Sequence, residues 1–222
     1  MKSVCPPIFI TGCARSGTSL IAGIVELSGA FGGTTCGRTT ANKKGQFENV
    51  EIRNGIVKPY LKAIGADPMA QKPLPDVEHL EPFNELREAI MNVICRHGYR
   101  SGPWYYKGAK MCLLFPLFHK AFPHAKWIIV RRNDEDIIDS CLRTSFMKKC
   151  KGKEGWQRWV DHHKYCFELM KKSDLWTKEI CPSIFMSGNF EAIKTLITED
   201  LGLCWNQKKI EEFVDPSMYT IK

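Results

Sequence analysis

The chain of 222 residues lacks any apolar run long enough to cross a membrane, and it has no internal repeat or low-complexity tract. A membrane-spanning helix needs about 20 consecutive apolar residues. No signal-peptide core precedes the first apolar segment, which begins by residue 8. We therefore expect a cytoplasmic protein that does not contact a membrane. The length suits one sizeable domain, so we expect residues 1–222 to fold as one unit.

The ten cysteines lack the C-x-x-C spacing of redox and metal motifs. Cys13 lies in a glycine-rich segment, while Cys141 and Cys166 lie within helical patterns. This placement is typical of buried, reduced thiols rather than of a disulfide framework. His162, His163 and Cys166 could share one helix face, but a fourth ligand is not evident, and we expect no metal site.

Acidic residues are fewer than basic ones, 24 against 32, which gives a formal net charge of +8. This excess favours an anionic partner such as a multiply charged nucleotide, a polyanion or nucleic acid. Zinc-finger, RNP-type and homeodomain patterns are missing, and the basic residues are scattered. A nucleic-acid partner thus rests on net charge alone, and we do not expect one. We interpret the densest basic segment, 148–153, as a solvated loop.

The first motif is a phosphate-binding loop without its usual lysine. Residues 8–20 read IFITGCARSGTSL, which is an apolar strand, a loop between Gly12 and Gly17, and a helix start. Backbone N–H groups and the helix dipole attract an anion at such a turn. The spacing matches G-x-x-x-x-G-K-[ST], except that Thr18 replaces the lysine and a cation lies within the loop at Arg15. We predict a phosphate site that does not use Mg·ATP; the alternative is a turn without a ligand.

Short apolar segments alternate with segments of helical periodicity. The predicted strands are 7–11, 104–107, 127–130 and 184–187, and the predicted helices are 18–28, 51–64, 83–97, 115–121, 134–147, 155–172 and 191–201. This alternation predicts an α/β fold with three layers, α/β/α, around a central parallel sheet, like that of P-loop NTPases. Ligands of such sheets bind beyond the carboxyl ends of the strands, where the glycine loop already lies.

A second basic motif follows the predicted strand 127–130. Arg131 and Arg132 come directly after the strand, and Ser140 lies eight residues beyond Arg132 in the next predicted helix. An arginine and a hydroxyl at this edge of the sheet could bind a second phosphate. The alternative is that both arginines form ordinary ion pairs with the acidic run 134–136.

Together, the two motifs resemble those of the PAPS-dependent sulfotransferase family. In that family a G-x-x-R-S-G-T-[ST]-L loop binds the 5′-phosphosulfate end of the donor, and an arginine and a serine after a strand bind its 3′-phosphate. The resemblance implies PAPS as the donor co-substrate and PAP as the product. The residues that it places on the donor are Gly12, Cys13, Ala14, Arg15, Ser16, Gly17, Thr18, Ser19, Arg132 and Ser140.

Further segments extend the resemblance over nearly the whole chain. Residues 43–48 read KKGQFE and look like the K-G-x-F-E segment of many members. Lys107 and Lys110 precede 121–126, which is similar to the family's F-P-x-A-K pattern. One departure is Asp134, which stands where the family has a proline after the strand-end arginine. The departures concern the adenine contacts and the acceptor pocket more than the phosphate contacts.

The resemblance implies sulfuryl transfer, in which SO₃ moves in line from a phosphate leaving group to an acceptor hydroxyl or amine. Negative charge builds on the bridging oxygen, so cations near it stabilise the transition state more than the ground state. Arg15 and Lys107 are the candidate catalytic cations. Glu48 is the candidate general base, because the family often carries a glutamate in this loop. The alternatives are a surface lysine at 107 and an exposed loop acid at 48.

Other assignments remain open at this stage. His119, His124 and His162 are weaker alternatives for the base. A P-loop small-molecule kinase would share the fold, but it should show the missing lysine and a Mg²⁺-binding acid. A non-catalytic nucleotide-binding module would keep both phosphate motifs without a base. The acceptor, whether a small molecule, a carbohydrate or a protein tyrosine, is not defined, because acceptor pockets are built from variable loops.

Overall fold

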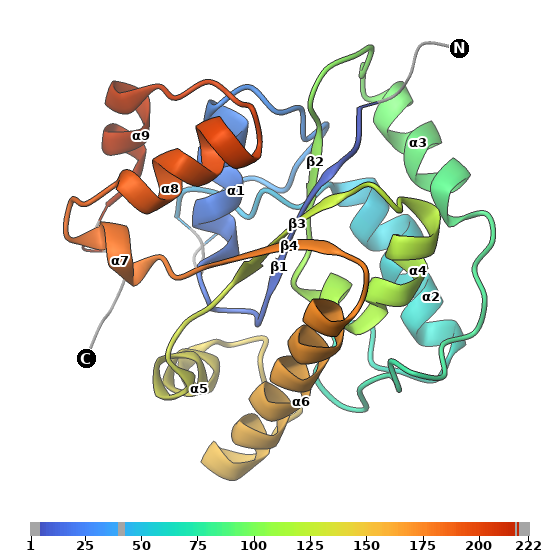
Figure 1. The fold of residues 1–222 in the computed structure, drawn as a ribbon. Coiled ribbons are helices and arrows are strands. Elements are labelled where there is room, and N and C mark those ends of the chain that lie inside the picture. Colours follow the sequence, from blue (N-terminus) through green and yellow to red (C-terminus); the bar gives the residue numbers. More distant parts are fainter. Residues whose placement is uncertain (1–4, 40–42, 216, 218–222) are drawn as a thin grey trace.

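The structure, a computed structural model, describes residues 5–39, 43–215 and 217. Its centre is a parallel sheet in the order β2-β1-β3-β4 (Figure 1). The strands are β1 (Ile8–Gly12), β2 (Tyr105–Lys107), β3 (Lys126–Val130) and β4 (Trp176–Ile180). Ile10 of β1 is in register with Lys107 on one side and with Ile128 on the other. The carboxyl ends of these strands therefore meet at one edge of the sheet.

Helices connect the strands and cover the sheet. They are α1 (Thr18–Leu27), α2 (Lys58–Ala63), α3 (Leu86–Arg96), α4 (Phe115–Ala121), α5 (Asp134–Arg143), α6 (Gly152–Lys172), α7 (Ser183–Met186), α8 (Glu191–Thr195) and α9 (Gln207–Phe213). Shorter helical turns are η1 (Ile52–Val57) and η3 (Leu196–Asp200), which are π-helical, and η2 (Ala109–Leu114), which is a 3₁₀ helix.

Successive side chains of β1 point to opposite faces of the sheet. Ile8 and Ile10 pack with buried residues of α1, α7, α8 and α9, whereas Phe9 packs with those of α2 to α6. Figure 1 shows α1, α7, α8 and α9 on one side of the sheet and α2, α3 and α4 on the other. The central strands β1 and β3 are largely apolar because both of their faces are covered. The predicted three-layer α/β/α architecture with a central parallel sheet is confirmed.

Three of the predicted strands occur within one residue of their predicted bounds, as β1, β2 and β3. The strand predicted at 184–187 is wrong, because Ser183–Met186 forms α7. The run Ile184-Phe185-Met186 is too short for periodicity to distinguish a strand from a helix. Phe185 and Met186 are buried, so the run is apolar for packing and not for pairing in the sheet.

Sequence patterns do not predict β4, the strand that occupies the edge of the sheet. Its sequence, Trp176-Thr177-Lys178-Glu179-Ile180, contains two charged residues, and Ile180 is its one buried residue. Edge strands are commonly charged on their exposed side, which protects them from pairing with other chains. The strand is held by backbone pairing with β3 rather than by burial of its side chains.

Several helices differ from prediction at their ends. The helix predicted at 51–64 begins with the π-helical turn η1 before α2, and the one predicted at 191–201 ends in η3 after α8. The helix predicted at 134–147 ends at Arg143. Its last predicted residues form a loop that borders the site described below.

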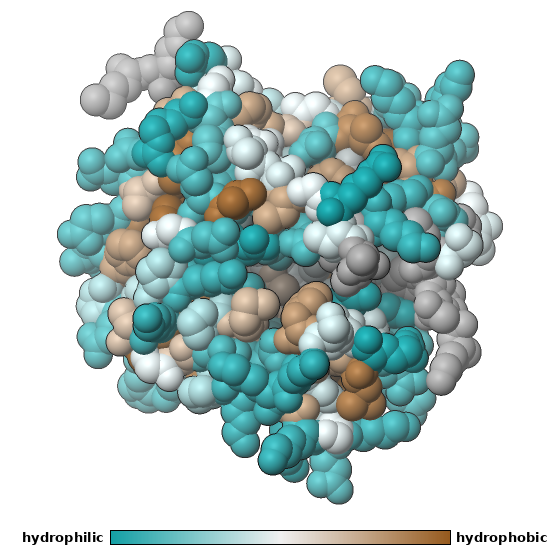
Figure 2. All heavy atoms as spheres, turned by 180° about the vertical axis from the view of Figure 1, so that it is seen from behind, coloured by the Kyte–Doolittle hydropathy of each residue, from teal (hydrophilic) through white to brown (hydrophobic). Residues whose placement is uncertain are grey.

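The surface has a largely polar character on the face drawn in Figure 2, where hydrophobic residues form small separate patches. Within the described residues, no helix combines the length and the apolar character needed to span a membrane.

Candidate active site

The loop after β1 has the geometry of an anion-binding turn. The N–H of Ser16 donates a hydrogen bond of 3.1 Å to the carbonyl of Cys13, which closes the turn. Gly17 has a φ of 99°, a conformation that favours glycine, and it precedes the first residue of α1. At Gly12 a Cβ would lie 2.5 Å from the carbonyl oxygen of Val130, so the loop passes too close to β3 for any side chain there.

Polar groups of this loop suit an anionic ligand. The N–H groups of Thr18 and Ser19 belong to the first turn of α1, where a helix supplies no acceptor and the dipole is positive. The hydroxyl of Ser16 is buried and has no hydrogen-bond partner among the described residues. A buried hydroxyl without a partner is costly. An oxygen of a phosphate or sulfate would satisfy it.

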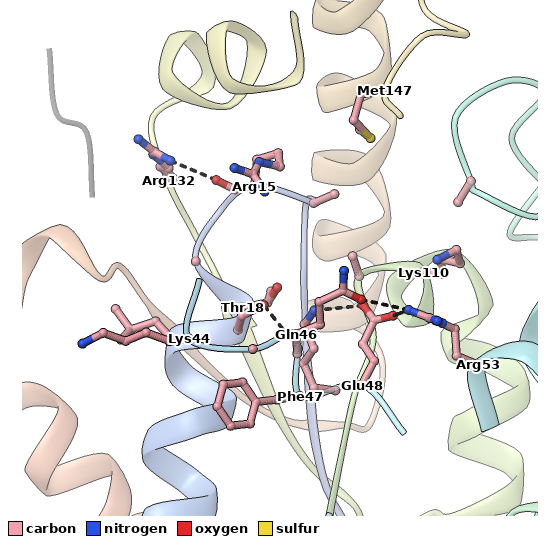
Figure 3. Close-up of a pocket in the computed structure, with 18 of the residues that line it drawn as sticks. Arg15, Thr18, Lys44, Gln46, Phe47, Glu48, Arg53, Lys110, Arg132 and Met147 are labelled. Carbon is pink, nitrogen blue, oxygen red and sulfur yellow. Dashed lines mark hydrogen bonds and ion pairs between the residues drawn. The ribbon is translucent and has the colours of Figure 1, made fainter. Parts of the chain in front are cut away.

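The two sequence motifs meet at Arg15. Its Nε donates a hydrogen bond of 2.9 Å to Oγ of Ser140 on α5. Figure 3 shows the second contact, in which the carbonyl of Arg15 accepts a hydrogen bond of 3.0 Å from Nη1 of Arg132. Arg15 has a φ of 74°, which is unusual for a residue with a side chain. The side chain of Arg15 therefore lies beside the second motif, and two arginines stand together at the ends of β1 and β3.

Helix α5 presents Ser140 to the loop. Its N-terminus is capped by Asn133, whose Oδ1 accepts hydrogen bonds from the N–H groups of Glu135 at 2.9 Å and Asp136 at 3.4 Å. This cap starts the helix at Asp134. Ser140 then falls on the buried face of α5 in its second turn.

The two consecutive arginines after β3 have different partners. Arg131 pairs with Glu179 of β4 at 3.2 Å and lies over the ring of Phe167. Arg132 has Asp136 at 3.6 Å from its Nε. Asp136 of the acidic run 134–136 thus lies near Arg132, while the partner of Arg131 lies on β4.

Lys107, the last residue of β2, forms a buried ion pair. Its Nζ donates a hydrogen bond of 2.9 Å to Oε1 of Glu48, and Lys107 is 5% exposed. Oγ1 of Thr11 donates to the carbonyl of Gly108 at 3.1 Å and so fixes the end of β2 against β1. Because both partners of the ion pair are largely removed from water, removing one would leave a buried charge.

Glu48 faces more positive than negative charge. Nη1 of Arg53 lies 3.5 Å from Oε2 of Glu48 and 2.9 Å from Oε1 of Gln46 (Figure 3). Burial raises the pKa of Glu48, but the charges of Lys107, Lys110 and Arg53 and the hydrogen bond from Lys107 outweigh burial and lower this pKa to about 2. Glu48 is therefore ionised at neutral pH, and it is a weak base.

Segment 43–48, which carries Glu48, is fixed between two helices. Oγ of Ser19 in α1 donates to the carbonyl of Gln46 at 3.2 Å. Nζ of Lys44 donates to the carbonyl of Phe213 in α9 and also lies over its ring. These contacts hold the segment in place, and the carboxylate of Glu48 lies at the end of β2, beside Lys107.

These groups border a cavity of about 400 Å³. Much of its lining is basic, and one wall is apolar. The apolar wall consists of Met69, Ala70, Phe146, Met147 and Trp159. The exposed fractions of Met69 and Phe146 are 39% and 44%, which are high for large apolar residues.

The buried side chain of Gln71 holds the apolar wall together. Its Nε2 donates a hydrogen bond of 2.8 Å to the carbonyl of Phe146, and its Oε1 accepts one of 2.9 Å from the N–H of Lys148. The indole N–H of Trp159 donates 2.8 Å to the carbonyl of Ala70. The loop that contains Ala70 and Gln71 is thus joined both to the loop at Phe146 and to α6, and the three segments form one surface.

Most of the predicted site residues line this cavity. They are Ala14, Arg15, Gly17, Thr18, Ser19, Glu48, Lys107 and Arg132. Gly12, Cys13, Ser16 and Ser140 are buried behind the lining. Burial raises the pKa of the Cys13 thiol well above its ordinary value, so Cys13 is not a thiolate at neutral pH.

Among the described histidines, His163 is the one that lines the cavity, and sequence patterns do not single it out as a base. Its Nδ1 lies 2.8 Å from the carbonyl of Trp159, and burial lowers its pKa to about 3. His163 is thus neutral at physiological pH. The structure does not bring His119, His124 or His162 to the cavity.

A glycine loop, two strand-end arginines and a basic cavity thus lie together at the carboxyl ends of a parallel α/β sheet. The family model described as "Sulfotransferase family" matches residues 6–181, and the chain belongs to this family, whose members transfer sulfuryl groups. The resemblance inferred from the two motifs is thereby confirmed.

A solved structure that matches the chain is that of the sulfotransferase STF1 from Mycobacterium tuberculosis H37Rv. The match has 12% sequence identity and a TM-score of 0.49, and it covers 99% of this chain and 74% of that one. No curated protein matches the chain.

Proposed function

We propose that the chain transfers a sulfuryl group from PAPS to a hydroxyl or amine of an acceptor in this cavity. The observation that carries the proposal is the meeting of Arg15, Ser140 and Arg132 beside the glycine loop. Two anion-binding groups at neighbouring strand ends suit one donor with phosphates at two positions. PAPS supplies the activated sulfuryl group, and PAP is its product.

Each part of the site has a role in this proposal. The N–H groups of Thr18 and Ser19 and the buried hydroxyl of Ser16 hold the 5′-phosphosulfate end. Arg132 and Ser140 hold the 3′-phosphate, and a guanidinium suits this task because it binds phosphate in a bidentate manner. Arg15 lies between the two sites and stabilises negative charge at both.

Lys107 and Glu48 carry the chemistry. The ammonium of Lys107 stabilises charge on the leaving phosphate oxygen. Glu48 accepts the proton of the acceptor. A carboxylate with a low pKa suits this step, because the acceptor oxygen becomes strongly acidic only as its bond to sulfur forms. Glu48 holds the ammonium of Lys107 in place by their hydrogen bond until then.

Metal-free titration separates this proposal from its alternatives. We expect PAP to bind in the presence of EDTA by calorimetry, and Mg·ATP not to displace it. Tight binding of Mg·ATP in preference to PAP would overturn the proposal in favour of a kinase. A non-catalytic module would bind PAP but would not convert PAPS to PAP in the presence of a pool of acceptors, and Glu48→Gln would leave its function unchanged.

A further inference from the structure

The cavity holds an excess of positive charge around Glu48. Lys107, Lys110 and Arg53 line the cavity near this single carboxylate, and Lys58 lines it near Lys110. Glu48 is paired with Lys107 at 2.9 Å and with Arg53 at 3.5 Å. One acid therefore faces three cations, and a fourth cation, Lys58, lies beside Lys110. Like charges at close range in a partly buried site repel one another.

Lys58 and Lys110 carry most of this excess, because within the described residues the side chain of neither lysine forms a hydrogen bond or an ion pair. Burial lowers the pKa of Lys110, and the charges of Lys107, Lys58 and Arg53 lower this pKa further against the opposing charge of Glu48. The other acid of the lining, Asp215, lies near Lys44 instead.

The π-helical turn η1 brings Arg53 and Lys58 together. The N–H of Lys58 donates to the carbonyl of Arg53, five residues earlier. A π-helical turn aligns residues at this spacing, and such turns occur often at functional sites. The backbone thus departs from α-helical geometry where two cations reach the cavity.

These cations are distinct from those proposed to bind the donor. Arg15 and Arg132 are joined to each other and to Ser140 at the ends of β1 and β3. In Figure 3, Arg53 and Lys110 lie together on the other side of the cavity, beyond Gln46 and Glu48. The phosphates of one donor at Arg15 and Arg132 therefore do not neutralise the positive charge of Arg53 and Lys110.

We propose that the acceptor carries an anionic group, a carboxylate, sulfate or phosphate, which Lys58, Lys110 and Arg53 bind. The apolar wall at Met69 and Phe146 then covers the body of the acceptor, a ring or a short carbon skeleton. This inference rests on the proposed function, since it names the acceptor class of the same site. It restricts the acceptors to alcohols and amines that carry a carboxylate, sulfate or phosphate, and it excludes neutral alcohols and amines.

Matched pairs of acids and amides test the inference. The probes are 4-hydroxyphenylacetate and glucuronate, each compared with its neutral amide, titrated by calorimetry into protein saturated with PAP. We expect each acid to bind at least about tenfold more tightly than its amide, because a hydrogen bond to a charged group contributes about that factor. Lys58→Gln combined with Lys110→Gln should remove this preference and leave the affinity for PAP unchanged.

Lys62→Gln is the matched control, because Lys62 lies on the same helix as Lys58 but is exposed and outside the cavity lining. It should keep the preference for the acids. The inference is overturned if the acids bind no better than the amides, or if the double variant keeps the preference. Should PAP itself fail to bind, the proposed function fails, and the same acid and amide titrations without PAP still decide whether the anion subsite exists.

Discussion

The Nε of Arg15 donates a hydrogen bond of 2.9 Å to the Oγ of Ser140, and so joins two segments that lie 125 residues apart in the chain. Arg132 strengthens the connection by donating to the carbonyl of Arg15. The glycine loop and α5 are therefore joined to each other. A ligand that contacts one of the two motifs is within reach of the other.

The pairing of Glu48 with Lys107 predicts a specific dependence of stability on pH. We expect Glu48→Gln to lower the free energy of unfolding at pH 7 by about 1–3 kcal/mol, because the ammonium of Lys107 loses a charged partner. The folded-state pKa of Glu48, about 2, lies below its ordinary value of 4.5. The stabilisation is therefore complete above about pH 4.5 and is lost as the pH falls towards 2.

Urea unfolding of both proteins between pH 7 and pH 3 measures this effect. The difference between wild type and Glu48→Gln should shrink as the pH falls. A difference that stays constant over this range would show that Glu48 is not held ionised by its neighbours.

The sequence identifies local features of this site well. Gly12, Gly17 and Arg15 follow a buried strand and precede a helix, and this arrangement is set by residues adjacent in the chain. The α/β fold follows from the same alternation of elements. The strand β4 escapes prediction because backbone pairing with β3, not its own pattern, holds it in the sheet.

Contacts between distant segments cannot be predicted from local patterns. The ion pair of Lys107 with Glu48 joins residues 59 positions apart. Arg53 and Lys58 reach the cavity through a π-helical turn that helical periodicity does not indicate. The apolar wall likewise depends on Gln71, whose polar side chain offers no sequence signal for a structural role.

The repulsion among the cavity cations predicts that the charge of Lys110 lowers the stability of the unliganded protein. Burial lowers the pKa of Lys110 below its ordinary value. Below the folded-state pKa the charged lysine destabilises the fold, and this cost is relieved as the pH rises through that pKa. Lys110→Gln should therefore match or exceed wild type in thermal stability at pH 7, and lose that advantage at alkaline pH. A clear destabilisation at pH 7 would contradict this account.

Gln71 provides a test of the apolar wall. We expect Gln71→Leu to destabilise the protein by about 1–3 kcal/mol, because the carbonyl of Phe146 and the N–H of Lys148 lose their buried partner. Binding of PAP should be unchanged in calorimetry, since the donor residues lie at the ends of β1 and β3. Loss of PAP affinity equal to that of an Arg132 variant would show that the wall belongs to the donor site.

The central claim is that Arg132 and Ser140 recognise a 3′-phosphate, and the most direct test compares PAP with 5′-AMP by calorimetry in the absence of metal. Wild type should bind PAP at least about tenfold more tightly than 5′-AMP, because a charge-assisted hydrogen bond contributes about that factor. Arg132→Gln should bind both ligands alike. Arg131→Gln is the control, because Arg131 pairs with Glu179, and it should keep the preference. Equal affinity of wild type for PAP and 5′-AMP, or an unchanged preference in Arg132→Gln, would contradict the account.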